Sequence, residues 1–472
     1  MIKKLFKHSL VYGLAPFVPK VINLLMLPIF TAVLNPLDYG VQSLLNSSMG
    51  LIGVLSMLGL GLPLTNAFYQ HNFHYKKRWA QFYGFLNIWM LFYALILAIV
   101  IYFIVPKEAE QNLFLIIVLN VIPLVVFGPT STIGQLYYQL NQEPKQVVIR
   151  TIVISVLTVF LNYVTIVLLD LHYMGWFFST CISNLLLNAS YWYPLHFKIG
   201  IKPIYNFKNK VIKSALKVSL PMIPHYYGAF LLGSADTLIL KYFKVSTAQI
   251  GFYGFAATFG GMMAMVTNAV NTAAGPILFE MIRNKEYQSL KKMIWIIQGA
   301  FLITVSLGCI WTKEIFEVVI KNRDLQQTYF LAALLILGHN YRPMYFGSSS
   351  FLFYNEKTRN LWKVTLGAGI FCILANFLLI PYFGFKTPAF ILVFSYLIMG
   401  YGVFFLKDYK VVSKVNFYPL MWFTFTVLSG FATLYVLKYF NVYAKLILTF
   451  LCGVALVLFF IGKKRLLFTL NK

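Results

Sequence analysis

The sequence predicts an all-α polytopic membrane protein with about fourteen transmembrane helices. Three observations lead to this fold class: 60% of the 472 residues are hydrophobic, only 11% are charged, and the mean hydropathy is +0.74. Water cannot solvate such a surface, whereas hydrocarbon accepts it when every backbone polar group is bonded inside a helix. The composition therefore excludes the soluble domains that a chain of this length would otherwise suggest.

Apolar runs of spanning length follow one another along the whole chain, since a transmembrane helix needs roughly 20 apolar residues. The first run follows Lys3, Lys4 and Lys7 and is too long for the apolar part of a signal peptide, so we expect it to remain as an uncleaved helix. The predicted spans are 8–34, 41–69, 79–104, 111–139, 145–169, 173–195, 215–241, 250–276, 292–312, 328–354, 360–381, 387–406, 416–438 and 442–462.

The basic residues between the runs predict the orientation. With the N-terminus in the cytoplasm, 28 of the 39 Lys and Arg residues fall on the cytoplasmic side, nine fall outside, and Lys20 and Arg342 fall within helices. The positive-inside rule then places both termini in the cytoplasm. The net charge of +26 is accordingly explained by loops that contact anionic lipid, and nucleic acid is not an expected partner.

An internal repeat is visible between the first and seventh predicted helices. Both contain Pro-x-x-Pro followed by a side chain that can carry a positive charge, 205 residues apart. The pattern occupies Pro16, Pro19 and Lys20 in the first helix and Pro221, Pro224 and His225 in the seventh. Proline removes a backbone hydrogen bond and bends a helix, so these prolines are the expected helix breaks.

A second match at an offset of 214 residues pairs Pro129 with Pro343 and Asn162 with Asn376. Together the matches predict two duplicated six-helix lobes, and an even number of helices per lobe makes the repeat parallel. The predicted units are an N-terminal lobe at 1–197, a cytoplasmic amphipathic linker at 198–214, a C-terminal lobe at 215–406, and helices 13 and 14 at 407–472.

Few ionisable residues lie inside the predicted spans, where a charge costs several kcal/mol unless it faces water or a partner. They are Lys20, His225, Asp236, His339 and Arg342. Four can be cationic, and they predict an electropositive chamber at the junction of the lobes. The alternatives are a snorkelling Lys20, neutral packing histidines, and an Asp236 that forms a static ion pair.

No catalytic constellation, metal-ligand spacing or phosphate-binding loop is present in the sequence, so neither an enzyme nor a cofactor is expected. The four cysteines, Cys181, Cys309, Cys372 and Cys452, lie in apolar runs and are interpreted as small core residues. A transporter driven by an ion gradient or by the gradient of its substrate is the expected class. Asp236, the carboxylate within the spans, is the candidate for ion coupling.

Several segments resemble the polysaccharide flippases that export O-antigen and capsule repeat units, within the multidrug/oligosaccharidyl-lipid/polysaccharide (MOP) exporter superfamily. The segments that carry the resemblance are Leu27-Pro28 to Leu34, Pro36 to Gly40, Leu220 to Pro224, Ser234 to Leu240, the Gly251 motif (Gly251 to Gly254) and the Pro276 motif (Pro276 to Phe279). Thr237 departs from the pattern, because many relatives carry Arg after the aspartate of helix seven.

The resemblance implies a flippase in the bacterial cytoplasmic membrane that works by alternating access. Its implied substrate is a polyprenyl-pyrophosphate-linked oligosaccharide, and membrane lipid and polysaccharide assembly proteins are the implied partners. An anionic pyrophosphate suits the predicted basic chamber. A cation-coupled multidrug antiporter and a membrane-embedded polysaccharide polymerase or ligase are the alternatives; the first should show an acidic cavity and the second a large outer loop.

Overall fold

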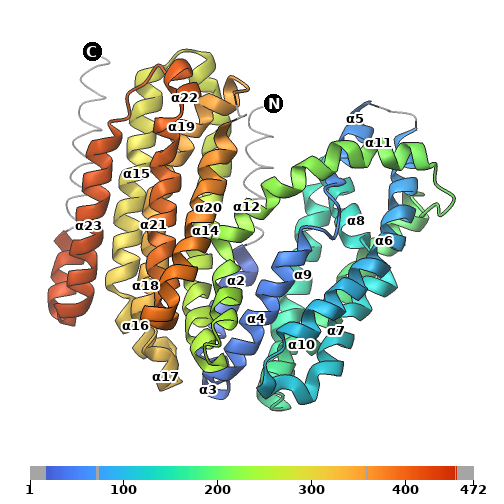
Figure 1. Cartoon of the computed structure of the whole chain (residues 1–472), viewed down its shortest axis with the longest axis horizontal. Coiled ribbons are helices and arrows are strands. Elements are labelled where there is room, and N and C mark those ends of the chain that lie inside the picture. The colour runs from blue at the N-terminus through green and yellow to red at the C-terminus, as the bar shows by residue number, and fades with distance from the viewer. Residues whose placement is uncertain (1–16, 71–73, 358–359, 452, 454–472) are drawn as a thin grey trace.

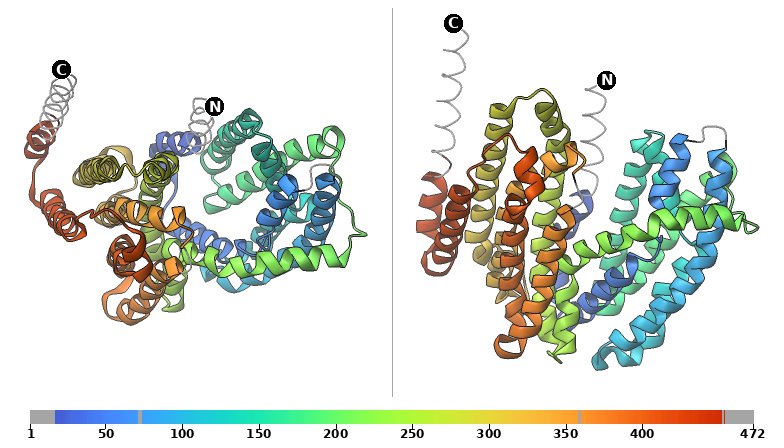
Figure 2. Two further views of the ribbon diagram at one scale, coloured as in Figure 1. Left: turned by 90° about the horizontal axis from the view of Figure 1, so that it is seen from above. Right: turned by 45° about the horizontal axis from the view of Figure 1, so that its top comes forward.

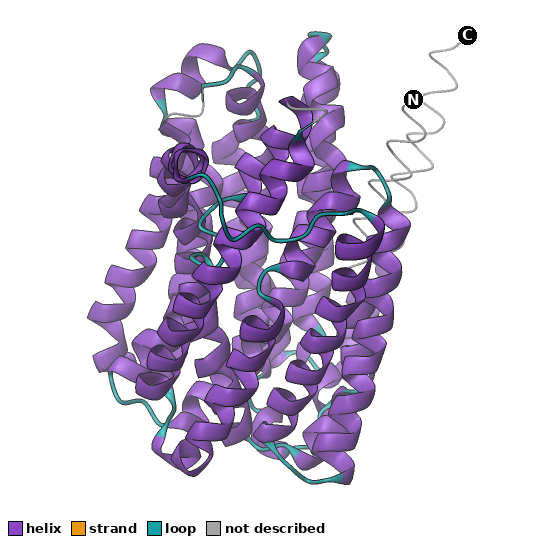
Figure 3. Ribbon diagram, turned by 90° about the vertical axis from the view of Figure 1, so that its right-hand side faces the viewer, coloured by secondary structure: helices purple, strands orange, loops and turns teal. Residues whose placement is uncertain are grey.

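The computed structural model describes residues 17–70, 74–357, 360–451 and 453, without the side chains of residues 17–20, 70, 222, 225, 226 and 229. These residues form helices joined by short loops, and no strand occurs among them (Figure 3). The all-α prediction is thereby confirmed.

The N-terminal helices run in sequence order through the blue and teal part of Figure 1. They are α2 (Phe17–Leu25), α3 (Leu27–Val33), α4 (Pro36–Gly53), α5 (Gly61–Gln70), α6 (Tyr75–Ile104), the 3-10 helix η1 (Lys107–Asn112), α7 (Leu113–Phe127), α8 (Thr130–Leu140), α9 (Pro144–Asn162), the π-helix η2 (Tyr163–Leu168), α10 (Tyr173–Tyr193) and the π-helix η3 (Pro194–Lys198).

The remaining helices begin with the linker and end near the C-terminus. They are α11 (Asn209–Ser219), η4 (Leu220–Met222), α12 (Ile223–Gly233), α13 (Ala235–Tyr242), α14 (Thr247–Arg283), α15 (Tyr287–Ile310), α16 (Thr312–Val319), α17 (Arg323–Gln326), α18 (Tyr329–Leu337), η5 (Gly338–Tyr341), α19 (Arg342–Tyr354), α20 (Leu361–Phe383), η7 (Gly384–Lys386), α21 (Thr387–Gly402), η8 (Val403–Phe405), α22 (Lys407–Val412) and α23 (Pro419–Tyr439), followed by an apolar helix over Val442–Leu451.

Each predicted span coincides, over its described residues, with one helix or with a chain of shorter helices. Seven helices in the described part are long and apolar enough to cross a membrane by themselves. Several of the other spans are divided, such as the second into α4 and α5 and the tenth into α18, η5 and α19. The observed helices are therefore consistent with fourteen spans.

Proline and capping residues explain where many helices begin. Pro36 follows Asn35, whose side chain accepts a hydrogen bond from the backbone N–H of Asp38 while Asp38 accepts from the N–H of Asn35. This reciprocal pair satisfies two backbone donors that a helix start leaves free. Proline stands in the first turn of other helices too, because its fixed φ suits that position and its missing N–H costs nothing there. These helices are α3, α9, α19, α21 and α23.

The N-terminal and C-terminal helices form two groups that meet at one end and diverge toward the other (Figures 1 and 2). Six hydrogen bonds between described residues join the groups at the meeting end, which carries the predicted outer loops. Lys241 donates to the carbonyls of Phe103, Ile104 and Val105 at the end of α6. The other three join Thr247 to Glu108, the N–H of Lys321 to Thr31, and Asn322 to the carbonyl of Leu34.

The tightest contact between the groups is the crossing of α4 with α14. A Cβ atom on Gly251 would lie 1.7 Å from the carbonyl oxygen of Pro36, and one on Gly40 would lie 2.0 Å from that of Thr247. A Cβ on Gly254 would lie 1.8 Å from the hydroxyl of Ser43. Only glycine allows two helix backbones to approach so closely, as is common between membrane helices.

Buried apolar side chains form separate cores. One large core combines α13 to α22 with residues of α3, α4 and η2, and two others consist of residues between α4 and α11. The lobe boundaries inferred from the repeat stay a prediction.

Candidate functional site

Arg342 and His339 lie where the tenth spanning helix is interrupted. The helix α18 ends at Leu337 and is followed by the 3-10 turn η5. The α-helix resumes as α19 at Arg342, with Pro343 in its first turn. Gln298 of α15 stabilises the interruption, because its side-chain N–H donates to the carbonyl of Asn340 at 2.8 Å. The side-chain amide of Asn340 is buried beside the break and has no hydrogen-bond partner among the described residues.

The Arg342 guanidinium is half-buried and contacts neutral groups. Its Nη2 lies 3.5 Å from Oδ1 of Asn268 on α14, and its Cζ lies 5.6 Å from the ring centre of Tyr396. The four ion pairs found among the described residues do not include Arg342. Arginine stays charged in proteins, so this cation keeps donors available for an anion.

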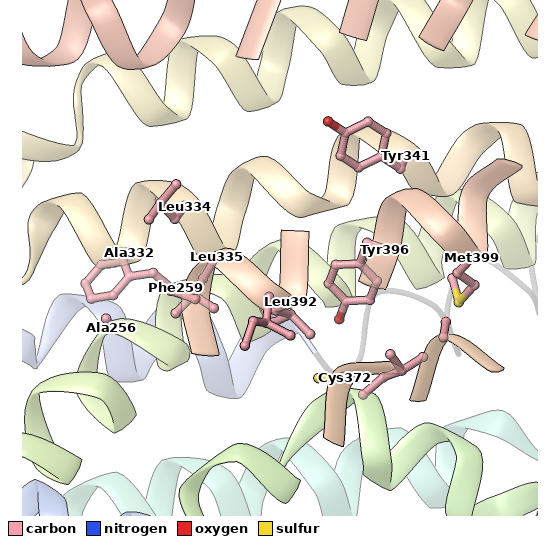
Figure 4. Packing of buried hydrophobic residues seen from close by; sticks show 14 of the residues in the cluster. Ala256, Phe259, Ala332, Leu334, Leu335, Tyr341, Cys372, Leu392, Tyr396 and Met399 are labelled. Atoms are coloured by element: carbon pink, nitrogen blue, oxygen red, sulfur yellow. The ribbon is translucent and has the colours of Figure 1, made fainter. Parts of the chain in front are cut away.

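His339 faces the protein interior. Its side chain is 2% exposed, its Nδ1 lies 3.3 Å from the hydroxyl of Thr267, and its ring centre lies 5.2 Å from that of Tyr396. Tyr396 of α21 therefore contacts both predicted site residues of the tenth span. Figure 4 shows this tyrosine in the core, with its hydroxyl directed toward the side on which Cys372 lies.

Asp236 is buried in α13 and is bound by three neutral side chains. The hydroxyl of Tyr253 donates to Oδ2 at 2.6 Å, the amide of Asn376 donates to Oδ1 at 2.8 Å, and the thiol of Cys372 lies 3.5 Å from Oδ1. No cationic nitrogen of the described side chains forms an ion pair with it. The Oδ1 of Asn376 is buried without a partner at the same place.

The remaining predicted site residues lie in the first and seventh spans. Lys20 and Pro19 belong to α2 and His225 to α12, but their side chains lie outside the described residues, as does all of Pro16. Pro221 lies in η4, the 3-10 turn between α11 and α12, and Pro224 is the second residue of α12. The seventh span is divided again at Ser234, two residues before Asp236.

The structure thus brings His339 and Arg342 together and places Asp236 in a separate buried cluster. Tyr396 contacts the first pair, and Tyr253 and Asn376 bind Asp236 in the second cluster. Tyr396 could not be predicted as a site residue, because one tyrosine in an apolar helix is typical of packing. Tyr253 and Asn376 had weak signals: Tyr253 lies in the Gly251 motif and Asn376 in the repeat.

Polar side chains are exposed along the middle of α14. Asn268, Asn271 and Thr272 belong to a 37-residue helix of high hydropathy, yet all three are exposed. Amide and hydroxyl groups in a spanning helix are disfavoured against lipid, so this face is suited to water or to a polar ligand. Arg342 contacts the same face through Asn268.

These groups allow two kinds of chemistry. Arg342 can bind an oxyanion through two parallel N–H donors, and the amides of α14 can bond hydroxyl groups beside it. The buried carboxylate of Asp236 can hold a proton or a monovalent cation, because the groups around it are neutral and a carboxyl group accepts either. Among the described residues no cluster of three or more His, Cys, Asp or Glu side chains has the spacing of a metal site.

The sequence is similar to a described protein family and to a bacterial protein. A family model described as polysaccharide biosynthesis protein matches residues 5–282. The Lsg locus putative protein 1 of Haemophilus influenzae is 23% identical over 388 residues, which cover 75% of this chain and 86% of that protein.

Two solved structures share the fold. The lipid II flippase MurJ in an inward closed conformation has a TM-score of 0.68 at 11% identity and covers 91% of this chain and 98% of its own. An inward-facing multidrug resistance MATE family transporter of the MOP superfamily has a TM-score of 0.63 at 12% identity and covers 90% of this chain and 98% of its own.

Proposed function

Because the chain belongs to the polysaccharide biosynthesis protein family, we propose that it flips a polyprenyl-pyrophosphate-linked oligosaccharide across the bacterial cytoplasmic membrane. The fold it shares with a lipid II flippase and a MATE transporter supports a multi-pass membrane protein of the MOP exporter type. The substrate, the membrane and the cytoplasmic position of both termini are parts of the proposal.

The observation that carries the proposal is the unpaired guanidinium of Arg342 at the break of the tenth span. A permanent cation within a spanning helix is costly unless it faces water or an anion. The groups that surround it, Asn268 and Tyr396, are neutral. A pyrophosphate supplies the two oxygens that a guanidinium binds in parallel.

The rest of the substrate would contact groups next to this cation. The exposed amides and hydroxyl of α14 are suited to sugar hydroxyls, since they offer both donors and acceptors. Lys20 and His225 are proposed as further ligands of the pyrophosphate from the first and seventh spans. Membrane lipid would hold the polyprenyl chain, and polysaccharide assembly proteins are the proposed partners.

Asp236 is proposed as the ion-coupling residue. It is buried, and the groups that bind it are neutral, so its charge has no permanent compensation among the described side chains. A proton or cation from the gradient would neutralise it and favour one arrangement of the two proposed lobes over the other, which is the energetic requirement of coupling.

Transport of a fluorescent lipid-linked oligosaccharide in proteoliposomes tests the proposal. We expect Lys20→Ala and Arg342→Ala to reduce flipping about tenfold or more, because hydrogen bonds to charged groups contribute about 1.5–3 kcal/mol each. Lys20→Arg should recover part of the activity. Arg283→Ala is the matched control, because Arg283 is exposed at the end of α14. Normal flipping by both alanine variants would refute anion binding at this site.

A cation-coupled multidrug antiporter is the alternative within the same fold. An exporter of cationic drugs should offer a carboxylate to its substrate, whereas the accessible charged group of this site is the half-buried Arg342 and the carboxylate of Asp236 is buried. If drug efflux were retained in Arg342→Ala while oligosaccharide flipping was absent in the wild type, the antiporter would be favoured. Hydrolysis or polymerisation of the oligosaccharide would instead favour the membrane enzyme.

A further inference from the structure

The α20–η7–α21 hairpin carries a groove on its outer surface that the proposed transport mechanism does not use. Its volume is about 650 Å³, which falls within the range of about 300–1,000 Å³ typical of small-molecule sites. Aromatic side chains dominate the lining, and they come from both helices. They include Phe371 and Phe383 of α20 and Phe390 and Phe394 of α21.

The polar end of the groove lies at the turn between the helices. Lys386 and Thr387 line the groove there, and the hydroxyl of Thr387 has no hydrogen-bond partner among the described residues. The Thr387 side chain is 6% exposed, so water does not replace the missing partner freely. An unpaired buried hydroxyl costs free energy, and a ligand that accepts its hydrogen bond would recover that cost.

Two further features favour an anion at this end. The exposed ammonium of Lys386 lies 5.8 Å from the ring centre of Phe385, at the mouth of the groove. Thr387 is the first residue of α21, a 16-residue helix whose N-terminus carries partial positive charge. The predicted orientation places the turn at the outer surface of the membrane, where a lipid head group would lie.

We propose that this groove binds an anionic phospholipid, with the phosphate at Lys386 and Thr387 and an acyl chain along the phenylalanines. The apolar lining matches hydrocarbon, and the cation, hydroxyl and helix N-terminus match a phosphodiester. A zwitterionic lipid fits less well, because its ammonium group would approach Lys386. The inference does not rest on the proposed transport substrate.

Native mass spectrometry of the full chain tests the site by titration with phosphatidylglycerol and with phosphatidylcholine of the same acyl chains. We expect preferential binding of phosphatidylglycerol, and an approximately tenfold higher Kd for Thr387→Val and for Lys386→Gln. Thr387→Val keeps the side-chain shape and removes only the hydroxyl. Binding of phosphatidylcholine should change little in either variant.

Lys438→Gln is the matched control, because Lys438 is also an exposed lysine beside an aromatic ring, 5.1 Å from the centre of Tyr439, and it lies outside the groove. Equal Kd values for the two lipids, or an unchanged Kd in Thr387→Val, would overturn the proposal. An equal rise of the Kd for phosphatidylglycerol in the Lys438→Gln control would also overturn it. Tighter binding of a polyprenyl phosphate than of phosphatidylglycerol would show that the groove takes the carrier lipid instead. If Thr387→Val does not fold, the Kd of Lys386→Gln for phosphatidylglycerol tests the proposal by itself, because Lys386 lies at the exposed turn.

Discussion

The hydroxyl of Tyr253 on α14 lies 2.6 Å from Oδ2 of Asp236 on α13, and both side chains are buried. Asn376 of α20 bonds the other carboxylate oxygen, so three helices meet at one acidic group. A change in the charge of Asp236 would alter the strength of both bonds, because hydrogen bonds to an ionised acceptor are stronger than those to a neutral one. The packing of the C-terminal helices is therefore linked to the state of this residue.

The first prediction concerns coupling through Asp236. Asp236→Asn keeps the size of the side chain and removes its charge, so we expect flipping in proteoliposomes to lose its dependence on the ion gradient while substrate binding persists. Asp324→Asn, at an exposed aspartate of α17, is the control and should retain that dependence. Normal export by Asp236→Asn with intact gradient dependence would assign Asp236 a structural role only.

The second prediction concerns the crossing of α4 with α14. In Gly251→Ala the new Cβ would lie 1.7 Å from the carbonyl oxygen of Pro36, so the helices must separate. Overpacking typically costs about 1–3 kcal/mol, and we expect a lower thermal unfolding midpoint in detergent. Gly261→Ala is the matched control on the same helix, because nothing lies within 4 Å of its Cβ position. Equal unfolding midpoints for the two variants would show that α4 and α14 can separate without a loss of stability.

The third prediction concerns the buried ion pair of Lys445 with Glu314, whose atoms Nζ and Oε1 lie 2.6 Å apart. Glu314→Gln leaves the buried ammonium uncompensated, and breaking such a pair costs about 3–5 kcal/mol. We expect a clearly lower unfolding midpoint.

The exposed pair of Lys313 with Glu317, one helical turn apart on α16, provides the control for this ion pair. Glu317→Gln should change the midpoint little, because exposed pairs contribute about 0–1 kcal/mol. If both variants lowered the unfolding midpoint equally, the buried ion pair would contribute no more to stability than the exposed one.

The fourth prediction concerns orientation in the membrane. In a cysteine-free background, cysteines at Lys107 and Lys321 should react with a membrane-impermeant maleimide in intact cells. A cysteine at Lys210 of α11 should react only after permeabilisation. All three positions are exposed, so a failure to react reports the side of the membrane rather than burial. Reaction at Lys210 alone in intact cells would invert the predicted topology.

The sequence predicts the helices well because apolar run length and proline position are local properties. Pro221, for example, is one of the predicted helix breaks, and it lies in η4, the 3-10 turn between α11 and α12. The site contacts are not local: Asn376 is 140 residues from Asp236, and Asn268 is 74 residues from Arg342. Such pairs depend on how whole helices pack, and a single sequence contains no record of that arrangement.

Five of the six hydrogen bonds that join the two helix groups have a backbone atom as one partner. Lys241, for example, binds three consecutive carbonyls at the end of α6, and a carbonyl is present whatever side chain the residue carries. The joint can therefore tolerate sequence drift at Phe103, Ile104 and Val105 during evolution. The side chains around Arg342 could therefore change during evolution without altering the bonds that join the two helix groups.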